Sequence, residues 1–186
     1  MSPRKPRPEE IFDPFGFGLI VNPDAMFDYI QSEWAEEAEA KLTNINTRLT
    51  AALNKCPAHW VNGIAQQLGL STKGKRKDKV AAIKALLSDP QELRAVVEAL
   101  PDASREALRY VLEKGGWVKY GQIKRRWGGE DEDSFFWADR PPTSTIGQLR
   151  VSGLLFVGKT NIGGRNYKVA IVPKDLRQPL MEILGV

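Results

Sequence analysis

The sequence PPTSTIGQLRVSGLLFVGKTNIGGRNYKVAIV, residues 141–172, indicates the fold of the C-terminal half of this chain. Thr143 follows two prolines, which disfavour helix just before them, so we predict Thr143 as the N-cap of a short helix that Gly153 ends. Branched and aromatic residues in 154–157 and 167–172 predict two strands, and the glycines and asparagines between them predict a turn. The stretch therefore predicts a helix followed by a β-hairpin with a polar, basic tip.

Two further helices and a short strand are expected upstream of this stretch. Apolar residues at helical spacing predict a helix that the pair Gly115 and Gly116 ends, and Trp117 and Val118 can form a short strand. Tyr120, Ile123 and Trp127 place the next helix. This order resembles the winged-helix variant of the helix-turn-helix, in which the third helix enters the major groove and the hairpin wing follows the backbone. The resemblance covers residues 91–186 and implies DNA binding.

The resemblance also implies which residues would meet DNA. Hydroxyls and amides at the start of the third helix would contact phosphates, and Gln148 and Arg150 have side chains that can read base edges. The basic hairpin would contact the backbone or the minor groove. The DNA-binding residues predicted in this half are Lys119, Lys124, Thr143, Ser144, Thr145, Gln148, Arg150, Lys159, Asn161, Arg165, Asn166 and Lys168.

A second basic segment lies in the middle of the chain, in residues 57–90. Two short apolar helices are expected there, the first ended by Gly69, with a lysine-rich loop between them. This order resembles the SAP motif and the similar N-terminal helical module of the transcription terminator Rho, both associated with nucleic acids. Backbone amides at a helix start favour phosphate, and neighbouring lysines add charge. The predicted contacts are Lys73, Lys75, Arg76, Lys77 and Lys79, and the alternative for this cluster is a solvated charged face.

The first 56 residues are expected to form an arm and a long helix. Residues 1–21 combine prolines and basic side chains with an apolar run that prolines and glycines interrupt, so we expect an extended basic and aromatic arm. A long amphipathic helix is predicted over 22–56. Its apolar stripe from Phe27 to Leu53 either packs on its own chain or pairs with a second copy as a homo-oligomer. Weak helix formers at 43–47 mark a place where it can kink or break.

An acidic and aromatic insertion, residues 128–140, interrupts the predicted winged helix. Four consecutive acids, 130–133, would repel DNA at close range, so we expect the loop to fold away from the binding face or to serve a separate partner. The following Phe135, Phe136 and Trp137 either anchor the loop to its domain or form a protein-binding site. The segment from Glu130 to Trp137 is thus a candidate site for a protein partner.

Side chains suited to catalysis or metal binding are few. Cys56 and His59 are the single cysteine and the single histidine, whereas a structural zinc site needs four ligands. Nearness in sequence does not by itself place an imidazole against a thiol. We therefore expect a protein that is not an enzyme and has no metal site and no cofactor. The lone cysteine and the lack of a long apolar stretch predict a cytoplasmic protein, nucleoid-associated in a bacterium, without membrane contact.

Composition agrees with a globular protein that has a modest basic excess. Hydrophobic residues make up 42% of the chain, and 27 Lys and Arg against 23 Asp and Glu give a net charge of +4. We expect a mainly α-helical protein with a small β-hairpin, in which a helical N-terminal region precedes the winged-helix domain. The predicted function is DNA binding, in transcription regulation or DNA maintenance. The alternative is a protein–protein assembly module that uses the winged helix and the long helix.

Overall fold

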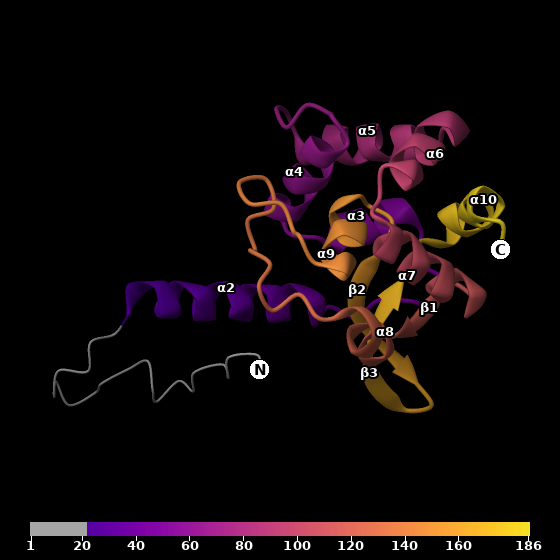
Figure 1. Cartoon of the computed structure of the whole chain (residues 1–186). Helices are drawn as coiled ribbons and strands as arrows, with labels where there is room; N and C mark the ends of the chain where they lie inside the picture. The colour runs from indigo at the N-terminus through magenta and orange to yellow at the C-terminus, as the bar shows by residue number, and fades with distance from the viewer. Residues whose placement is uncertain (1–21) are drawn as a thin grey trace, which may run out of the picture.

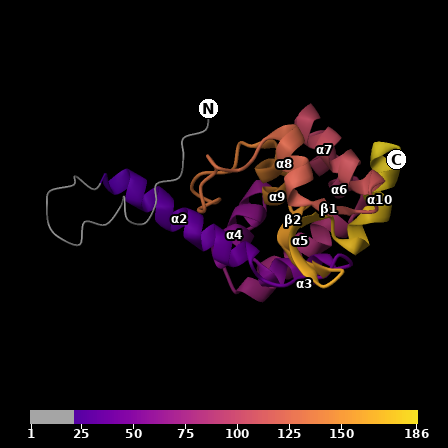
Figure 2. The ribbon, with the colours of Figure 1, turned by 90° about the horizontal axis from the view of Figure 1, so that it is seen from below.

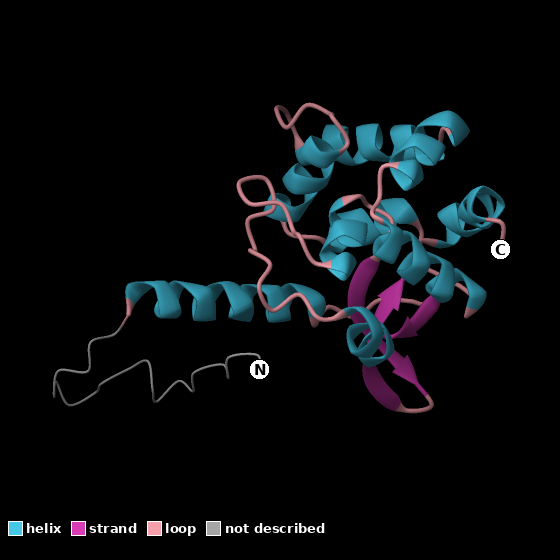
Figure 3. Cartoon of the chain, viewed as in Figure 1, coloured by secondary structure: helices cyan, strands magenta, loops and turns pink. Residues whose placement is uncertain are grey.

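The computed structural model describes residues 22–186, and in this range the chain forms nine helices and one three-stranded sheet (Figure 1). Figure 3 shows that helices dominate and that the strands gather in one place. The prediction of a mainly helical protein with a small hairpin is confirmed. The predicted arm falls on residues 1–21, outside the described range. Between residues 22 and 186, none of the helices combines the length and the apolar character that a bilayer-spanning segment requires.

The elements follow one another closely along the chain. The helices are α2 (Pro23–Glu39), α3 (Leu49–Lys55), α4 (Ala58–Gln67), α5 (Arg76–Ser88), α6 (Pro90–Glu98), α7 (Asp102–Glu113), α8 (Tyr120–Trp127), α9 (Thr145–Val151) and α10 (Lys174–Leu184). The strands are β1 (Trp117–Lys119), β2 (Phe156–Ile162) and β3 (Arg165–Ile171).

The long helix predicted over 22–56 is two helices, α2 and α3, so that prediction is wrong. The chain leaves the helical path where the weak helix formers lie and runs beside β2 instead. There the Thr43 amide donates to the Lys159 carbonyl at 2.8 Å, and the Lys159 amide donates to the Lys41 carbonyl at 3.2 Å. The connecting segment therefore satisfies part of its backbone on the edge of the sheet, which also covers that edge.

α2 extends away from the body of the protein (Figure 1). Its start is well defined, because the Asn22 side chain accepts the Asp24 amide at 3.1 Å and Pro23 lies in the first turn. Figure 2, seen from below, shows that its N-terminal turns lie beyond the other described elements, while its C-terminal end reaches the sheet. Part of the face of α2 consequently has no helix packed against it.

The C-terminal half begins with α7, β1, α8, α9, β2 and β3, in the expected order. The sheet has the order β1-β3-β2 with both pairings antiparallel. The hairpin is longer than predicted, because β2 and β3 continue to Ile162 and Arg165. Gly163 and Gly164, with φ of +59° and +83°, form the two-residue turn that a right-twisted hairpin favours.

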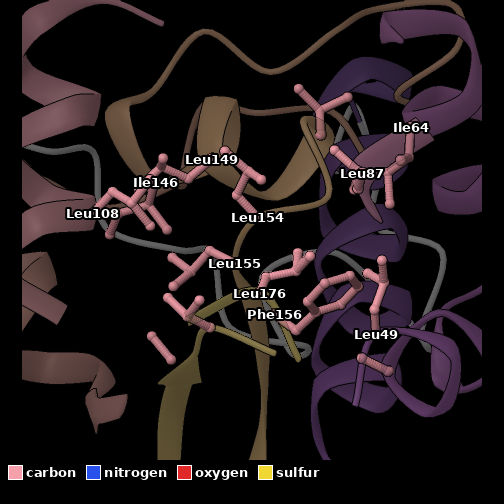
Figure 4. Close-up of a cluster of buried hydrophobic side chains, with 14 of the residues drawn as sticks. Leu49, Ile64, Leu87, Leu108, Ile146, Leu149, Leu154, Leu155, Phe156 and Leu176 are labelled. Atoms are coloured by element: carbon pink, nitrogen blue, oxygen red, sulfur yellow. The ribbon is translucent and has the colours of Figure 1, made fainter. Parts of the chain in front are cut away.

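Buried side chains from α3 to α10 form one core, and α9 lies inside it (Figure 4). Leu49 and Leu87 come from the N-terminal half, while Leu108, Ile146 and Leu149 come from the C-terminal half; all five are 0% exposed. Figure 4 shows side chains of both groups around the same interior. The boundaries predicted at residues 57 and 91 therefore fall within a shared core, whose apolar burial stabilises both halves together.

Candidate functional site

The predicted recognition helix, α9, is almost entirely buried. Five of its seven residues are buried, and it packs against α7, α4 and α8. Thr145 and Gln148 are only partly exposed. The Gln148 side-chain amide donates to the Thr143 carbonyl at 3.1 Å, and its Oε1 accepts from the Ser104 hydroxyl at 3.3 Å. Only a narrow side of α9 is therefore accessible to solvent, and on it Gln148, which was predicted to read a base edge, already has hydrogen-bond partners within the protein.

The N-terminus of α9 is closed by the acidic insertion. The N-cap is Ser144, one residue later than predicted, and its hydroxyl accepts the Gly147 amide at 2.9 Å. The Asp133 carboxylate accepts from the Thr143 amide at 3.0 Å, from the Ser144 amide at 3.2 Å and from the Ser144 hydroxyl. A carboxylate at this helix start occupies the position that a phosphate would need. Thr143 and Ser144, predicted to contact phosphate, are engaged by Asp133 instead.

Arg150 lies in the interior and is only 4% exposed. Its Nη1 donates to Glu39 Oε1 at 2.6 Å and to the two carboxylate oxygens of Glu130 at 2.8 and 3.0 Å. The guanidinium carbon also lies 4.7 Å from the ring centre of Trp60 and 5.3 Å from that of Trp137. The prediction that Arg150 reads a base edge is wrong in this conformation, because the guanidinium joins α2, the insertion and α9.

The charges around Arg150 shift each other's pKa. Burial alone raises the pKa of Glu39, but the attraction of Arg150 and Lys168 brings it below its ordinary value. Burial lowers the pKa of Arg150, but Glu130 and Glu39 raise it above its ordinary value. The Tyr120 hydroxyl donates to Glu130 at 2.8 Å, and burial together with this carboxylate raises the pKa of Tyr120. At neutral pH Glu39 and Arg150 are therefore charged and the Tyr120 phenol is neutral.

The acids of the insertion are largely used inside the protein. Glu130 pairs with Arg150, Asp131 lies 3.2 Å from the ammonium of Lys124, and Asp133 caps α9. Lys124, predicted to contact DNA, is therefore paired within the chain. A cleft of about 600 Å³ remains between α2 and these acids. The repulsion expected between residues 130–133 and DNA is reduced by this internal pairing.

The aromatic residues of the insertion hold it to the body and to α2. Trp137 is 4% exposed and stacks on Trp60 with ring centres 4.6 Å apart. The Trp60 indole donates to the Phe135 carbonyl at 3.1 Å. Phe136 is half-buried and stacks against Phe27 of α2 with ring centres 6.2 Å apart. Anchoring, one of the two roles expected for these side chains, is therefore what the contacts show.

The hairpin keeps part of its predicted basic surface open. Lys159 and Arg165 are exposed on β2 and β3. Asn161 and Asn166, by contrast, bond to each other across the strands at 3.2 Å, and Asn161 also accepts the Gly164 amide. Lys168 pairs with Glu39 and lies 4.2 Å from the centre of the Tyr120 ring. The asparagines therefore fix the turn, and Lys168 is shared with the buried cluster.

The basic segment at the start of α5 contains cations that bond within the protein and cations that are exposed. Arg76 donates to the carbonyls of Leu53 and Asn54 at 2.9 and 3.0 Å, which places a cation at the C-terminus of α3. Lys79 donates to Asn62 at 2.7 Å. The exposed cations of this segment are Lys73, Lys75 and Lys77, and we call these three residues the lysine loop. In Figure 1 the α4–α5 connection lies at the opposite end of the molecule from the hairpin turn.

Cys56 and His59 face different partners. The Cys56 thiol donates to the Ala52 carbonyl at 3.5 Å, and burial raises its pKa to about 11. The His59 ring meets the ring of Phe136 edge-on, with centres 4.9 Å apart. Within residues 22–186, no group of three or more His, Cys, Asp or Glu side chains is arranged to hold a metal ion.

Comparison with protein-family models, with curated proteins and with solved structures finds no match to this chain.

Proposed function

We propose that this protein binds nucleic acid without catalysis, and that residues 91–186 act as a winged-helix domain that grips the backbone through its hairpin. The observation that supports this function is the charge of the sheet. β1 contributes Lys119, β2 contributes Lys159, and β3 contributes Arg165 and Lys168, while the three strands contain no carboxylate. Cations gathered on one element attract phosphates, because binding releases the counterions of the nucleic acid.

Lys159 and Arg165 are the principal contacts in this proposal. Both are exposed, and among residues 22–186 neither has a carboxylate partner. Lys119 lies 3.8 Å from the centre of the Tyr167 ring, so its ammonium is held beside the hairpin rather than paired with an acid. The pairing register puts Lys159 and Lys168 on one face of the sheet and Lys119 and Arg165 on the other, so the hairpin presents one open cation on each face.

Sequence-tolerant binding follows from the state of the other predicted contacts. Arg150 is buried, Gln148 is engaged with α7 and with the start of α9, and the two asparagines of the hairpin bond to each other. Without free base-reading groups on α9, affinity depends on charge and backbone shape. The lysine loop would add a second footprint for a ligand long enough to reach both ends of the molecule.

The test is fluorescence anisotropy with labelled duplex DNA across a salt series. Each phosphate contact contributes about 0.9 to the slope of log affinity against log salt. The double variant Lys159→Ala with Arg165→Ala should therefore reduce the slope by about 1.8 and weaken binding equally for two unrelated duplexes.

A matched control is the double variant Lys84→Ala with Arg94→Ala. Both residues are exposed on α5 and α6, and each double variant lowers the net charge from +4 to +2. The control should keep the parent slope, because its charges lie far from the hairpin (Figure 1). No binding at low salt, or equal slopes for the two double variants, would contradict the proposed function.

A further inference from the structure

α2 exposes a set of large apolar side chains on one face. Met26 is 43% exposed, Phe27 is 50% exposed and Trp34 is 42% exposed. Positions 26 and 34 lie two helical turns apart on the same side, and position 27 adjoins them. Phe27 and Trp34 also contact Phe136 of the insertion, with ring centres 6.2 and 6.0 Å apart. We call Met26, Phe27, Trp34 and Phe136 the aromatic patch. Exposed apolar patches of this kind mark docking surfaces.

The aromatic patch is bordered by acids. Glu33 and Glu37 are exposed and follow positions 26 and 30 by seven residues, which places them beside the same helical face. No residue of α2 is basic, whereas Asp24 and Asp28 add further negative charge near its start. The surface therefore suits an occupant that carries large apolar side chains together with cations.

We propose that the N-terminal segment of the same chain, residues 4–20, folds back and docks on the aromatic patch. This proposal does not depend on nucleic-acid binding. The segment ends next to Asn22, where α2 begins. It combines three cations in residues 4–7 with apolar side chains in residues 11–20. Its three acids are Glu9, Glu10 and Asp13, so the cations are grouped at the end of the segment that would reach the acidic border. The cations are Arg4, Lys5 and Arg7, and the apolar side chains are Ile11, Phe12, Phe15, Phe17, Leu19 and Ile20.

The length of the segment permits this arrangement. Glu37 lies 15 positions beyond Asn22, which is about 22 Å along a helix. Arg7 lies 15 positions before Asn22, and an extended chain of this length reaches about 50 Å. The segment can therefore turn back near Asn22 and bring its aromatic residues over the patch and its cations to the acidic border.

The same-chain arrangement is favoured over pairing with a second copy for two reasons. A short tether gives the segment an effective concentration in the millimolar range at its own patch, far above ordinary protein concentrations. A second α2 would also bring like charges together, because this helix contains only acidic charged residues. Residues 4–20 carry three cations and three acids, a net charge of zero, so they meet the acidic helix with less repulsion than a second α2 would.

The test is hydrogen exchange of the full chain, followed by mass spectrometry of peptides from α2. The triple variant Phe12→Ser, Phe15→Ser, Phe17→Ser should increase exchange of the α2 amides on the order of tenfold, because the helix loses its cover. The control variant Pro6→Ser, Pro8→Ser, Pro14→Ser changes three residues of the same segment but keeps its aromatic and basic residues, so exchange should stay at the parent rate.

Two outcomes would overturn the proposal. Equal exchange of α2 in the parent and in the phenylalanine variant would mean that the segment does not cover the patch. Protection that increases with protein concentration, together with a dimer in sedimentation, would assign the patch to a second copy. Glu33→Gln with Glu37→Gln should reproduce part of the increase in exchange and make the remaining protection less dependent on salt. DNA affinity in the phenylalanine variant should equal that of the parent, which separates this test from that of the hairpin.

Discussion

Replacing Arg150 with methionine should destabilise the protein strongly, because it leaves two carboxylates without their main partner. Arg150 Nη1 bonds both Glu39 and Glu130, whose side chains are 9% and 13% exposed. Methionine retains an apolar stem of similar length between Trp60 and Trp137 but cannot donate a hydrogen bond. The substitution therefore removes the charge with little loss of packing volume.

The expected loss of unfolding free energy is about 3 kcal/mol. Removing one partner of a buried ion pair costs about 3–5 kcal/mol, because the other charge stays desolvated. We expect the lower end of this range, since Lys168 still faces Glu39. An exposed ion pair would instead contribute about 1 kcal/mol or less. The size of the loss of unfolding free energy thus reports whether the charges are shielded from solvent to the extent that the exposures of their side chains indicate.

Urea unfolding monitored by tryptophan fluorescence at two pH values provides the assay. In the parent the pKa of Glu39 is lowered on folding, so its contribution is present above the unfolded pKa near 4.5 and is lost as pH falls through the folded value. In Arg150→Met, burial is expected to raise this pKa, so protonation should relieve the unpaired charge and shrink the deficit between pH 7 and about pH 5.

A companion variant separates charge from packing. Adding Glu39→Gln and Glu130→Gln to Arg150→Met removes the unpaired charges, so most of the lost stability should return. A loss below about 1 kcal/mol at pH 7, or a deficit that is the same at both pH values, would refute the assignment of a buried ion cluster.

Two further substitutions test how the insertion is held. Asp133→Ala removes the acceptor for the start of α9 and should lower the free energy of unfolding in urea by about 1–2 kcal/mol. The control Asp131→Ala removes only the exposed ion pair with Lys124 and should cost less than about 1 kcal/mol. Equal losses in the two variants would argue against the cap. Gly63→Ala would place a Cβ 2.4 Å from the Cβ of Trp137 and should lower stability by about 1–3 kcal/mol. In the control Gly121→Ala, the added Cβ meets nothing within 4 Å, and the thermal midpoint should rise because alanine favours helix more than glycine does. If Gly63→Ala is as stable as the parent, the insertion can move away from α4.

Local signals explain why the elements of the C-terminal half could be predicted. Gly153, Gly163 and Gly164 end the helix and turn the hairpin, and all three adopt positive φ. The short strand at Trp117 and Val118 pairs with β3 because the expected order of elements brings it there. Each of these features depends on residues close together in the sequence, where propensity and turn chemistry act directly.

The break between α2 and α3 was signalled only in part. Weak helix formers marked the place, but the periodicity of the apolar stripe continued through it and favoured one helix. The decisive contacts are with Lys159 and with the Arg177 guanidinium, which donates to the Ile45 carbonyl. Both partners lie more than a hundred residues away in sequence, and no local pattern indicates them.

The role of Arg150 depends on a partner still harder to find from sequence, since Glu39 is 111 residues away. One signal was present. Ile146, Leu149 and Arg150 stand at i, i+3 and i+4 of a short helix, so Arg150 shares the face that the two apolar residues bury. An arginine in such a position has to find carboxylates inside the fold, and the acidic insertion was the nearest source.

The insertion decides what α9 can do with a nucleic acid. Asp133 occupies the helix start, Asp131 faces Lys124, and Glu130 holds Arg150, so the chain supplies its own anions at three places where phosphates or bases were expected. For α9 to read a groove, the cap would have to open at a cost of about 1–2 kcal/mol and the buried pair at a cost of about 3–5 kcal/mol. A good bidentate base contact returns about 1–3 kcal/mol of discrimination. Base readout by α9 is therefore energetically unfavourable unless a partner first binds the displaced insertion. The cations of the hairpin, by contrast, can contact a nucleic-acid backbone without any rearrangement.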